Sequence, residues 1–243
     1  LGLFEIDADG DSVYWATSTP GVGDIWLGSV NHLAITDNGG IHIAMGGYNA
    51  NMDASFVDNI GSNVHHATGG GGSESIYMRF GSNRSLELLT SLMGRSGDDA
   101  FNYIETQGDT VIFGINGANS AYPVLDAYGS NMYYATRQSV NGASYMMKLD
   151  QNADLLYGSY LDGNSHDGIS AIAVNPVYDY QTVVMGWSWG TAYERWMDAP
   201  SSPTAYIDTT SNDIGISEDI YIYMLKPYEI IVLPIELLSI DAE

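Results

Sequence analysis

Internal repetition is the feature of this sequence that most constrains its fold, because a repeated sequence folds into repeated structural units. The strand-like segment Ser-Tyr-Met-Met-Lys-Leu at 144–149 has relatives at 3–6, 75–80 and 222–226. The aligned charged residues are 74, 69 and 78 residues apart; they are Glu5, Arg79, Lys148 and Lys226. The dipeptide Asp-Ala recurs with nearly the same period, beginning at Asp53, Asp126 and Asp198.

Each repeat has the same order of predicted elements. A first strand is followed by a polar turn, a second strand, a loop rich in Gly, Ser and Asp, two further strands and a longer polar loop. No segment keeps a helical period over three turns, so almost no helix is expected. Four short antiparallel strands form one blade of a β-propeller, and blades bury their faces by stacking on one another.

The sequence therefore predicts an all-β protein of about three four-stranded antiparallel β-propeller blades. The expected repeats cover residues 1–75, 76–144 and 145–221, a fourth begins at 222–229, and residues 230–243 connect to a following module. One strand of each blade is expected to come from the neighbouring repeat. Because roughly four to eight blades close a ring, we expect an incomplete ring or part of a larger propeller. Missing blades of the same polypeptide, or a protein partner, should cover its open ends.

The charge of the chain excludes some partners. Seven Lys and Arg residues against 30 Asp and Glu residues give a net charge of −23. Such a surface repels nucleic acid and anionic lipid headgroups. No apolar run approaches the roughly 18 residues of a membrane span, so no direct membrane insertion is expected. Divalent cations and neutral ligands such as glycans remain compatible with this charge.

The third repeat carries a resemblance to a known family. Residues 145–168, which include Met-Lys-Leu-Asp and Leu-Leu-Tyr-Gly-Ser-Tyr-Leu, and the apolar strand 169–174 resemble the SBBP-type β-propeller repeat. The second repeat keeps Ser-Gly-Asp-Asp at 96–99 and Tyr-Pro at 122–123, whereas the first is the most diverged. The resemblance covers nearly all of residues 1–229 and implies a propeller from a secreted or cell-surface protein of Bacteroidota.

The C-terminal tail carries a second resemblance. Leu-Pro-Ile-Glu-Leu-Leu at 233–238 is similar to a segment that often opens the next module in Bacteroidota proteins exported by the type IX secretion system. That module usually precedes a sorting domain. The similarity implies an extracellular location.

One candidate metal site stands out in the first polar turn. Asp7, Asp9 and Asp11 alternate around Gly10, as the oxygen ligands of Ca²⁺ loops do. The other interpretation is an ordinary β-hairpin turn, in which Asp-Gly supplies a positive φ. The equivalent turns of the other repeats lack the Asp series, which favours the hairpin. Calcium is the only cofactor that the sequence suggests.

A candidate ligand site lies in the third repeat, where Trp187, Trp189 and Trp196 are concentrated. Aromatic rings bind the CH-rich faces of sugars, but they also form small satellite cores beneath long loops. The sequence contains no recognisable catalytic motif. We therefore expect a non-enzymatic scaffold, adhesion or assembly module. A glycan-binding or glycan-cleaving module is the alternative.

Overall fold

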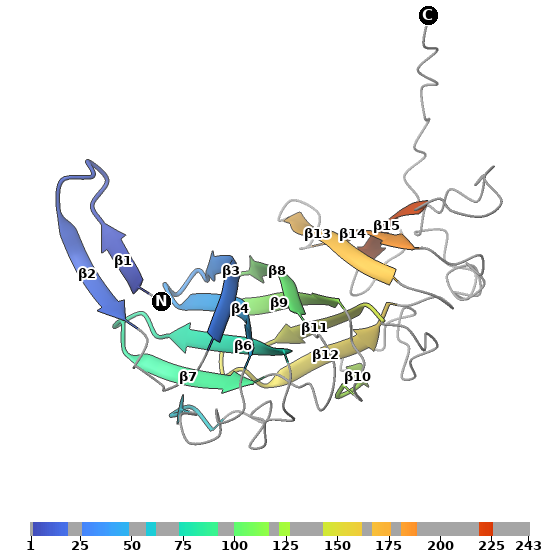
Figure 1. Ribbon diagram of the computed structural model, residues 1–243, viewed down its shortest axis with the longest axis horizontal. Coiled ribbons are helices and arrows are strands. Elements are labelled where there is room, and N and C mark those ends of the chain that lie inside the picture. Colours follow the sequence, from blue (N-terminus) through green and yellow to red (C-terminus); the bar gives the residue numbers. More distant parts are fainter. Residues whose placement is uncertain are drawn as a thin grey trace, which may run out of the picture.

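The protein is an all-β structure. The computed structural model describes residues 2–18, 26–48, 57–61, 73–91, 100–116, 122–126, 143–161, 167–175, 181–188 and 219–225. Within these ranges every regular element is a β-strand, as the sequence predicts, and the strands form four antiparallel sheets (Figure 1). No helix in the described ranges is long and apolar enough to cross a membrane.

The two outer sheets are small. Sheet A is a hairpin of β1 (Gly2–Ile6) and β2 (Val13–Ser18). Sheet D has three strands, which are β13 (Asp167–Asn175), β14 (Gln181–Ser188) and β15 (Asp219–Leu225).

The two central sheets have five strands each, in the same spatial order. Sheet B consists of β3 (Trp26–Ile35), β4 (Ile41–Tyr48), β6 (Ser73–Phe80), β7 (Leu86–Ser91) and the outer β5 (Val57–Asp58). Sheet C consists of β8 (Ala100–Gln107), β9 (Thr110–Asn116), β11 (Tyr145–Leu149), β12 (Leu155–Tyr160) and the outer β10 (Leu125–Asp126). Each therefore has the four expected strands plus a two-residue strand on its outer edge.

The boundaries of the sheets and those of the sequence repeats differ by two strands. Sheet B combines the last two long strands of one repeat, β3 and β4, with β6 and β7, which open the next repeat. The expectation that one strand per sheet comes from the neighbouring repeat was wrong, since two do. Residues 41, 43 and 45 of β4 lie opposite residues 80, 78 and 76 of β6, so this pairing gathers six apolar side chains on one buried face.

The hairpins β1–β2, β6–β7 and β11–β12 repeat one another in detail. Each has a register shift at the residue before its turn, at Glu5/Ile6, Arg79/Phe80 and Lys148/Leu149. Each turn also holds a residue of positive φ, which is 77° at Gly10, 65° at Arg84 and 59° at Ala153. That residue donates its N–H to the carbonyl three residues earlier in all three turns. The structure therefore repeats where the sequence similarity is faint.

Apolar side chains fill the spaces between successive sheets. One cluster joins sheets A and B, a second joins B and C, and a third joins C and D. Alternate residues of β11 pack into different clusters, because Met147 faces sheet B and Met146 faces sheet D. The first strands contact one another, β8 with β3 and β13 with β8. They lie on the same side of the molecule, towards the top in Figure 1.

Candidate functional site

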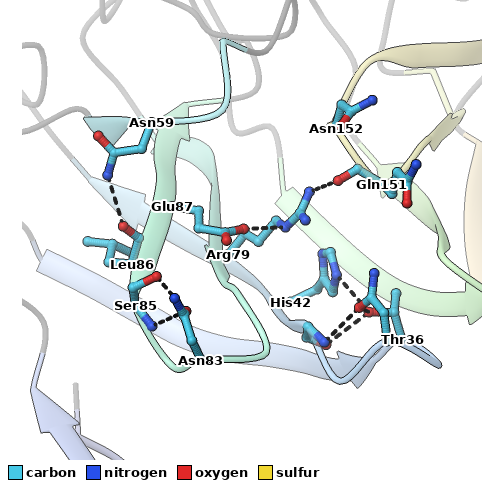
Figure 2. Close-up of polar contacts among 12 residues, drawn as sticks. Thr36, His42, Asn59, Arg79, Asn83, Ser85, Leu86, Glu87, Gln151 and Asn152 are labelled. Atoms are coloured by element: carbon cyan, nitrogen blue, oxygen red, sulfur yellow. Dashed lines mark hydrogen bonds and ion pairs between the residues drawn. The ribbon is translucent and has the colours of Figure 1, made fainter.

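The most prominent polar cluster lies between sheets B and C. Figure 2 shows part of it, with Thr36, His42 and Arg79. His42 of β4 is buried with its two ring nitrogens near hydroxyl groups. Its Nδ1 is 2.7 Å from Oη of Tyr77, and its Nε2 is 3.4 Å from Oγ1 of Thr36. Tyr77 also stacks on the imidazole ring, with ring centroids 5.9 Å apart. The imidazole is thus held by two side chains, Tyr77 and Thr36.

Burial sets the protonation of this cluster. Desolvation, with a smaller contribution from the positive charge of Arg79, lowers the pKa of His42 to about 3. Desolvation also raises the pKa of Tyr77 above its ordinary value. Both side chains are therefore neutral at physiological pH. A neutral imidazole between two hydroxyl groups could in principle move a proton, but all three side chains are almost inaccessible to solvent and so to a substrate.

Arg79 connects the cluster to the next sheet. Its Nε lies 3.0 Å from Oε2 of Glu87 as an ion pair, without the alignment of a hydrogen bond. Its Nη1 donates to the carbonyl of Gln151, which lies in the turn between β11 and β12 (Figure 2). The guanidinium group thus forms an ion pair within sheet B and donates one hydrogen bond to sheet C.

The repeat-equivalent residues have the same bridging role. Glu5 of sheet A accepts two hydrogen bonds from Arg84, in the β6–β7 turn of sheet B, at 2.7 and 2.9 Å. Lys148 of sheet C donates to Oγ1 of Thr182 in sheet D at 2.9 Å. Burial lowers the pKa of Lys148 to about 8. The aligned charged position therefore joins each sheet to the following one, although the residue type changes.

Further polar bonds connect neighbouring sheets at their ends. The N–H of Asn38 donates to Oδ1 of Asp109 at 3.1 Å, which joins the β3–β4 turn to the β8–β9 turn. The side-chain amide of Asn116 exchanges two hydrogen bonds with the backbone of Ile169, at 2.6 and 3.1 Å. These bonds fix the register between sheets, because they occur only when particular residues lie opposite one another.

The Asp series at residues 7–11 forms the turn of the β1–β2 hairpin. Oδ1 of Asp7 accepts the N–H groups of Asp11 and Ser12 at 2.9 and 3.3 Å. The pKa of Asp7 is lowered by a hydrogen bond with the Asp11 side chain and by backbone N–H donors, against a smaller opposing effect of desolvation. Among the described residues no three His, Asp or Glu side chains gather into a metal-binding set. These hydrogen bonds are those of a hairpin turn, and the Ca²⁺ site at Asp7, Asp9 and Asp11 stays a prediction.

The aromatic candidates are only partly within the described residues. Trp187 of β14 is half-buried, and its ring lies where a side chain on Gly168, its partner on β13, would stand. The ring is thus packed on the sheet. Trp189, Trp196, the loop at 94–99 and the connector at 230–243 lie outside the described residues, so the three-Trp ligand site stays a prediction.

Sequence reasoning did not assign functions to His42, Arg79, Glu87 or Lys148. A signal was present, because Arg79 and Lys148 interrupt apolar strands at the repeat period. A charged residue at such a place is either at a solvated strand end or buried with a partner. Only the structure shows that these side chains cross to the next sheet.

Comparisons with protein-family models and with curated proteins each found no match for this sequence. The SBBP resemblance therefore stays a prediction. What is established is an all-β chain of antiparallel sheets whose buried charged and polar side chains connect one sheet to the next.

Proposed function

We propose that this chain is part of a secreted or cell-surface β-propeller that acts as a non-catalytic scaffold, in adhesion or in assembly. The observation that carries the proposal is the strand-by-strand repetition of sheets B and C, which share strand order, bulges and turns and pack face to face. Blades of a propeller need this arrangement, because one sheet cannot bury both of its faces alone.

The use of the polar side chains supports a structural role. In the described ranges the buried cationic side chains, Arg79 and Lys148, bond to a neighbouring sheet. His42 is buried as a neutral group. Catalytic groups need access to substrate, and these residues lack it. The surface charge of −23 favours a soluble display module over one that binds nucleic acid.

The extracellular location rests on the resemblance of residues 145–174 to the SBBP-type repeat and of the tail to modules of type IX secretion. The ring would be completed by further blades of the same polypeptide or by a protein partner.

The location and the role can be tested together in the source organism. Antibodies against this chain should label intact cells, and brief treatment of those cells with an external protease should remove the signal. Beads coated with the protein should adhere to surfaces or cells, without hydrolysis of polysaccharides in the medium. Labelling only after lysis would refute the proposed location. Glycan binding that is abolished by Trp187→Ala would replace the scaffold role with the glycan-binding alternative.

A further inference from the structure

A two-residue strand covers the outer edge of each central sheet. Strand β10 lies beside β12 (Figure 1) and pairs with Tyr157 and Gly158, the third and fourth residues of β12. Strand β5 pairs with Leu88 and Leu89, which are likewise the third and fourth residues of β7. The same position of the two edges is therefore covered in both sheets.

The covered position is the middle of the edge. Strand β12 extends over Leu155–Tyr160, so two residues remain on either side of the covered pair. The free N–H and C=O groups of an edge strand are a template for pairing with another strand, but strands in proteins usually extend over at least three residues. A cover over the two central residues therefore leaves no stretch of β12 long enough for an incoming strand.

Two tyrosine hydroxyl groups hold this cover in sheet C, where we call residues 122–126 the clasp. Tyr145 of β11 donates its hydroxyl hydrogen to the carbonyl of Pro123. The N–H of Tyr122 donates to Oη of Tyr160, on β12, at 2.8 Å. Tyr145 and Tyr160 lie opposite one another on the two strands, so their side chains leave the same face of the sheet. The clasp is thus bonded to both β11 and β12.

The packing around the clasp accommodates these bonds. A Cβ atom at Gly158 would overlap both the hydroxyl oxygen of Tyr145 and the carbonyl oxygen of Pro123, so the glycine leaves room for this hydrogen bond. The ring of Tyr122 stacks on that of Tyr145 with centroids 4.5 Å apart, and both residues are buried. Val124 packs against the apolar cluster between sheets B and C. Buried apolar contact therefore adds to the two hydroxyl bonds in holding the clasp.

Sheet B holds its cover with a different residue. The backbone N–H of Asn59, which follows β5, donates to the carbonyl of Glu87 at 2.8 Å. The side-chain amide of Asn59 donates to the carbonyl of Leu86 at 3.1 Å (Figure 2). The two sheets thus cover the same edge position with unlike side chains, which indicates that the cover itself is the shared feature.

We propose that the clasp guards the outer edge of sheet C against strand addition, and that β12 accepts an external strand when the clasp is withdrawn. A segment of the same chain competes with a free peptide at an effective concentration on the order of millimolar, so the native protein excludes a strand offered at micromolar concentration. The guard keeps copies of this chain from pairing edge to edge. This device goes beyond the scaffold role proposed above and does not depend on it.

The test opens the clasp in the whole chain. In the double variant Leu125→Pro, Asp126→Pro, which we call the opened variant, both residues that pair with β12 lose their backbone N–H, whereas Tyr145 and Tyr160 are kept. The probe is a labelled, end-capped peptide with the sequence of residues 121–127, and a scrambled peptide is its control. Fluorescence anisotropy should show that the probe binds the opened variant at least about tenfold more tightly than the native protein. Amide hydrogen exchange should locate the protection in β12.

A third substitution tests the role of the hydroxyl group. Tyr145→Phe in the opened variant keeps the ring but removes the hydrogen bond to Pro123 of the probe, so probe binding should weaken about fivefold. The matched control is Val57→Pro, Asp58→Pro, which breaks the equivalent pairing in sheet B and should gain no probe protection in β12.

Equal probe binding by the native protein and the opened variant would overturn the proposal. Protection that lies outside β12, or probe binding that Tyr145→Phe leaves unchanged, would do the same. If the opened variant does not fold, Tyr145→Phe alone decides the question in the otherwise native chain. It should speed exchange in the clasp and at the β12 residues paired with it about fivefold and leave β9 unchanged, because only the clasp loses a bond. Unaltered exchange in the clasp and β12 would then refute the guard.

Discussion

Lys148 provides a quantitative test of how the sheets are joined. Its ammonium group is buried between sheets C and D, and Oγ1 of Thr182 accepts its hydrogen bond. Burial lowers its pKa from 10.5 to about 8. A difference of about 2.5 pKa units corresponds to roughly 3 kcal/mol of disfavour for the charged form in the folded state. Replacement of the charge by an apolar side chain should therefore stabilise the protein.

The sign of the pH dependence follows from the same shift. Below pH 8 the lysine is protonated in both the folded and the unfolded chain, so the full free-energy cost of burying its charge is present. Between pH 8 and about 10.5 the unfolded chain binds more protons than the folded one, so the free energy of unfolding rises with pH. The rise should approach roughly 3 kcal/mol. In Lys148→Met it should be absent.

The assay is urea unfolding of the native protein and of Lys148→Met at several pH values from 7 to 10. At pH 7 the variant should be more stable by about 1–3 kcal/mol, since the lost bond to Thr182 offsets part of the gain. The difference should shrink as the pH rises, and the subtraction removes the titration of other groups. A variant that is less stable at pH 7 by more than about 1 kcal/mol, with an unchanged pH dependence, would show that the pair is net stabilising and refute this reasoning.

Four further expectations concern other parts of the chain. Since the pKa of His42 is lowered to about 3, stability should fall by up to about 1.4 kcal/mol per pH unit as the pH drops below 6.5, and His42→Leu should remove that part of the decline in acid unfolding curves. Gly158→Ala should cost about 1–3 kcal/mol in urea unfolding, because a Cβ there would overlap Pro123 O, whereas Gly2→Ala, which meets nothing, should be neutral. Arg84→Asn, which tolerates the positive φ but loses the ion pair, should speed amide exchange in β1–β2 and leave β6 unchanged. EDTA should leave the thermal midpoint unchanged, because the described carboxylates form no metal-binding set; a fall that Ca²⁺ reverses would contradict this.

The strands themselves could be predicted from the sequence. The sequence predicts strand segments at 3–6, 75–80 and 144–149, and the structure has strands at Gly2–Ile6, Ser73–Phe80 and Tyr145–Leu149. These segments combine apolar and β-branched residues with clear polar turns, so local information sufficed. The two-residue strands β5 and β10 could not be predicted, because two residues carry no alternation.

The pairing of strands was harder to predict than their positions. A repeat in sequence has no marked beginning, so the same period fits sheets that start at β1 or at β3. Which strands form one sheet depends on whether the apolar faces of β4 and β6 coincide when they pair. That is a property of residues far apart in the sequence. The site was missed for a similar reason, since the partners of Arg79 and Lys148 lie in other sheets at Gln151 and Thr182.

The shift between repeats and sheets bears on how the chain responds to cleavage. Strands β4 and β6 are separated by a long connection in sequence, yet they pair over the whole of Ile41–Tyr48 and Ser73–Phe80. A single cut between them would place the two halves of sheet B on different fragments. The fragments would stay associated through this pairing and the apolar cluster beside it, and they should reassemble after mild denaturation. Nicked protein would thus keep its shape on a native gel and separate only in denaturant.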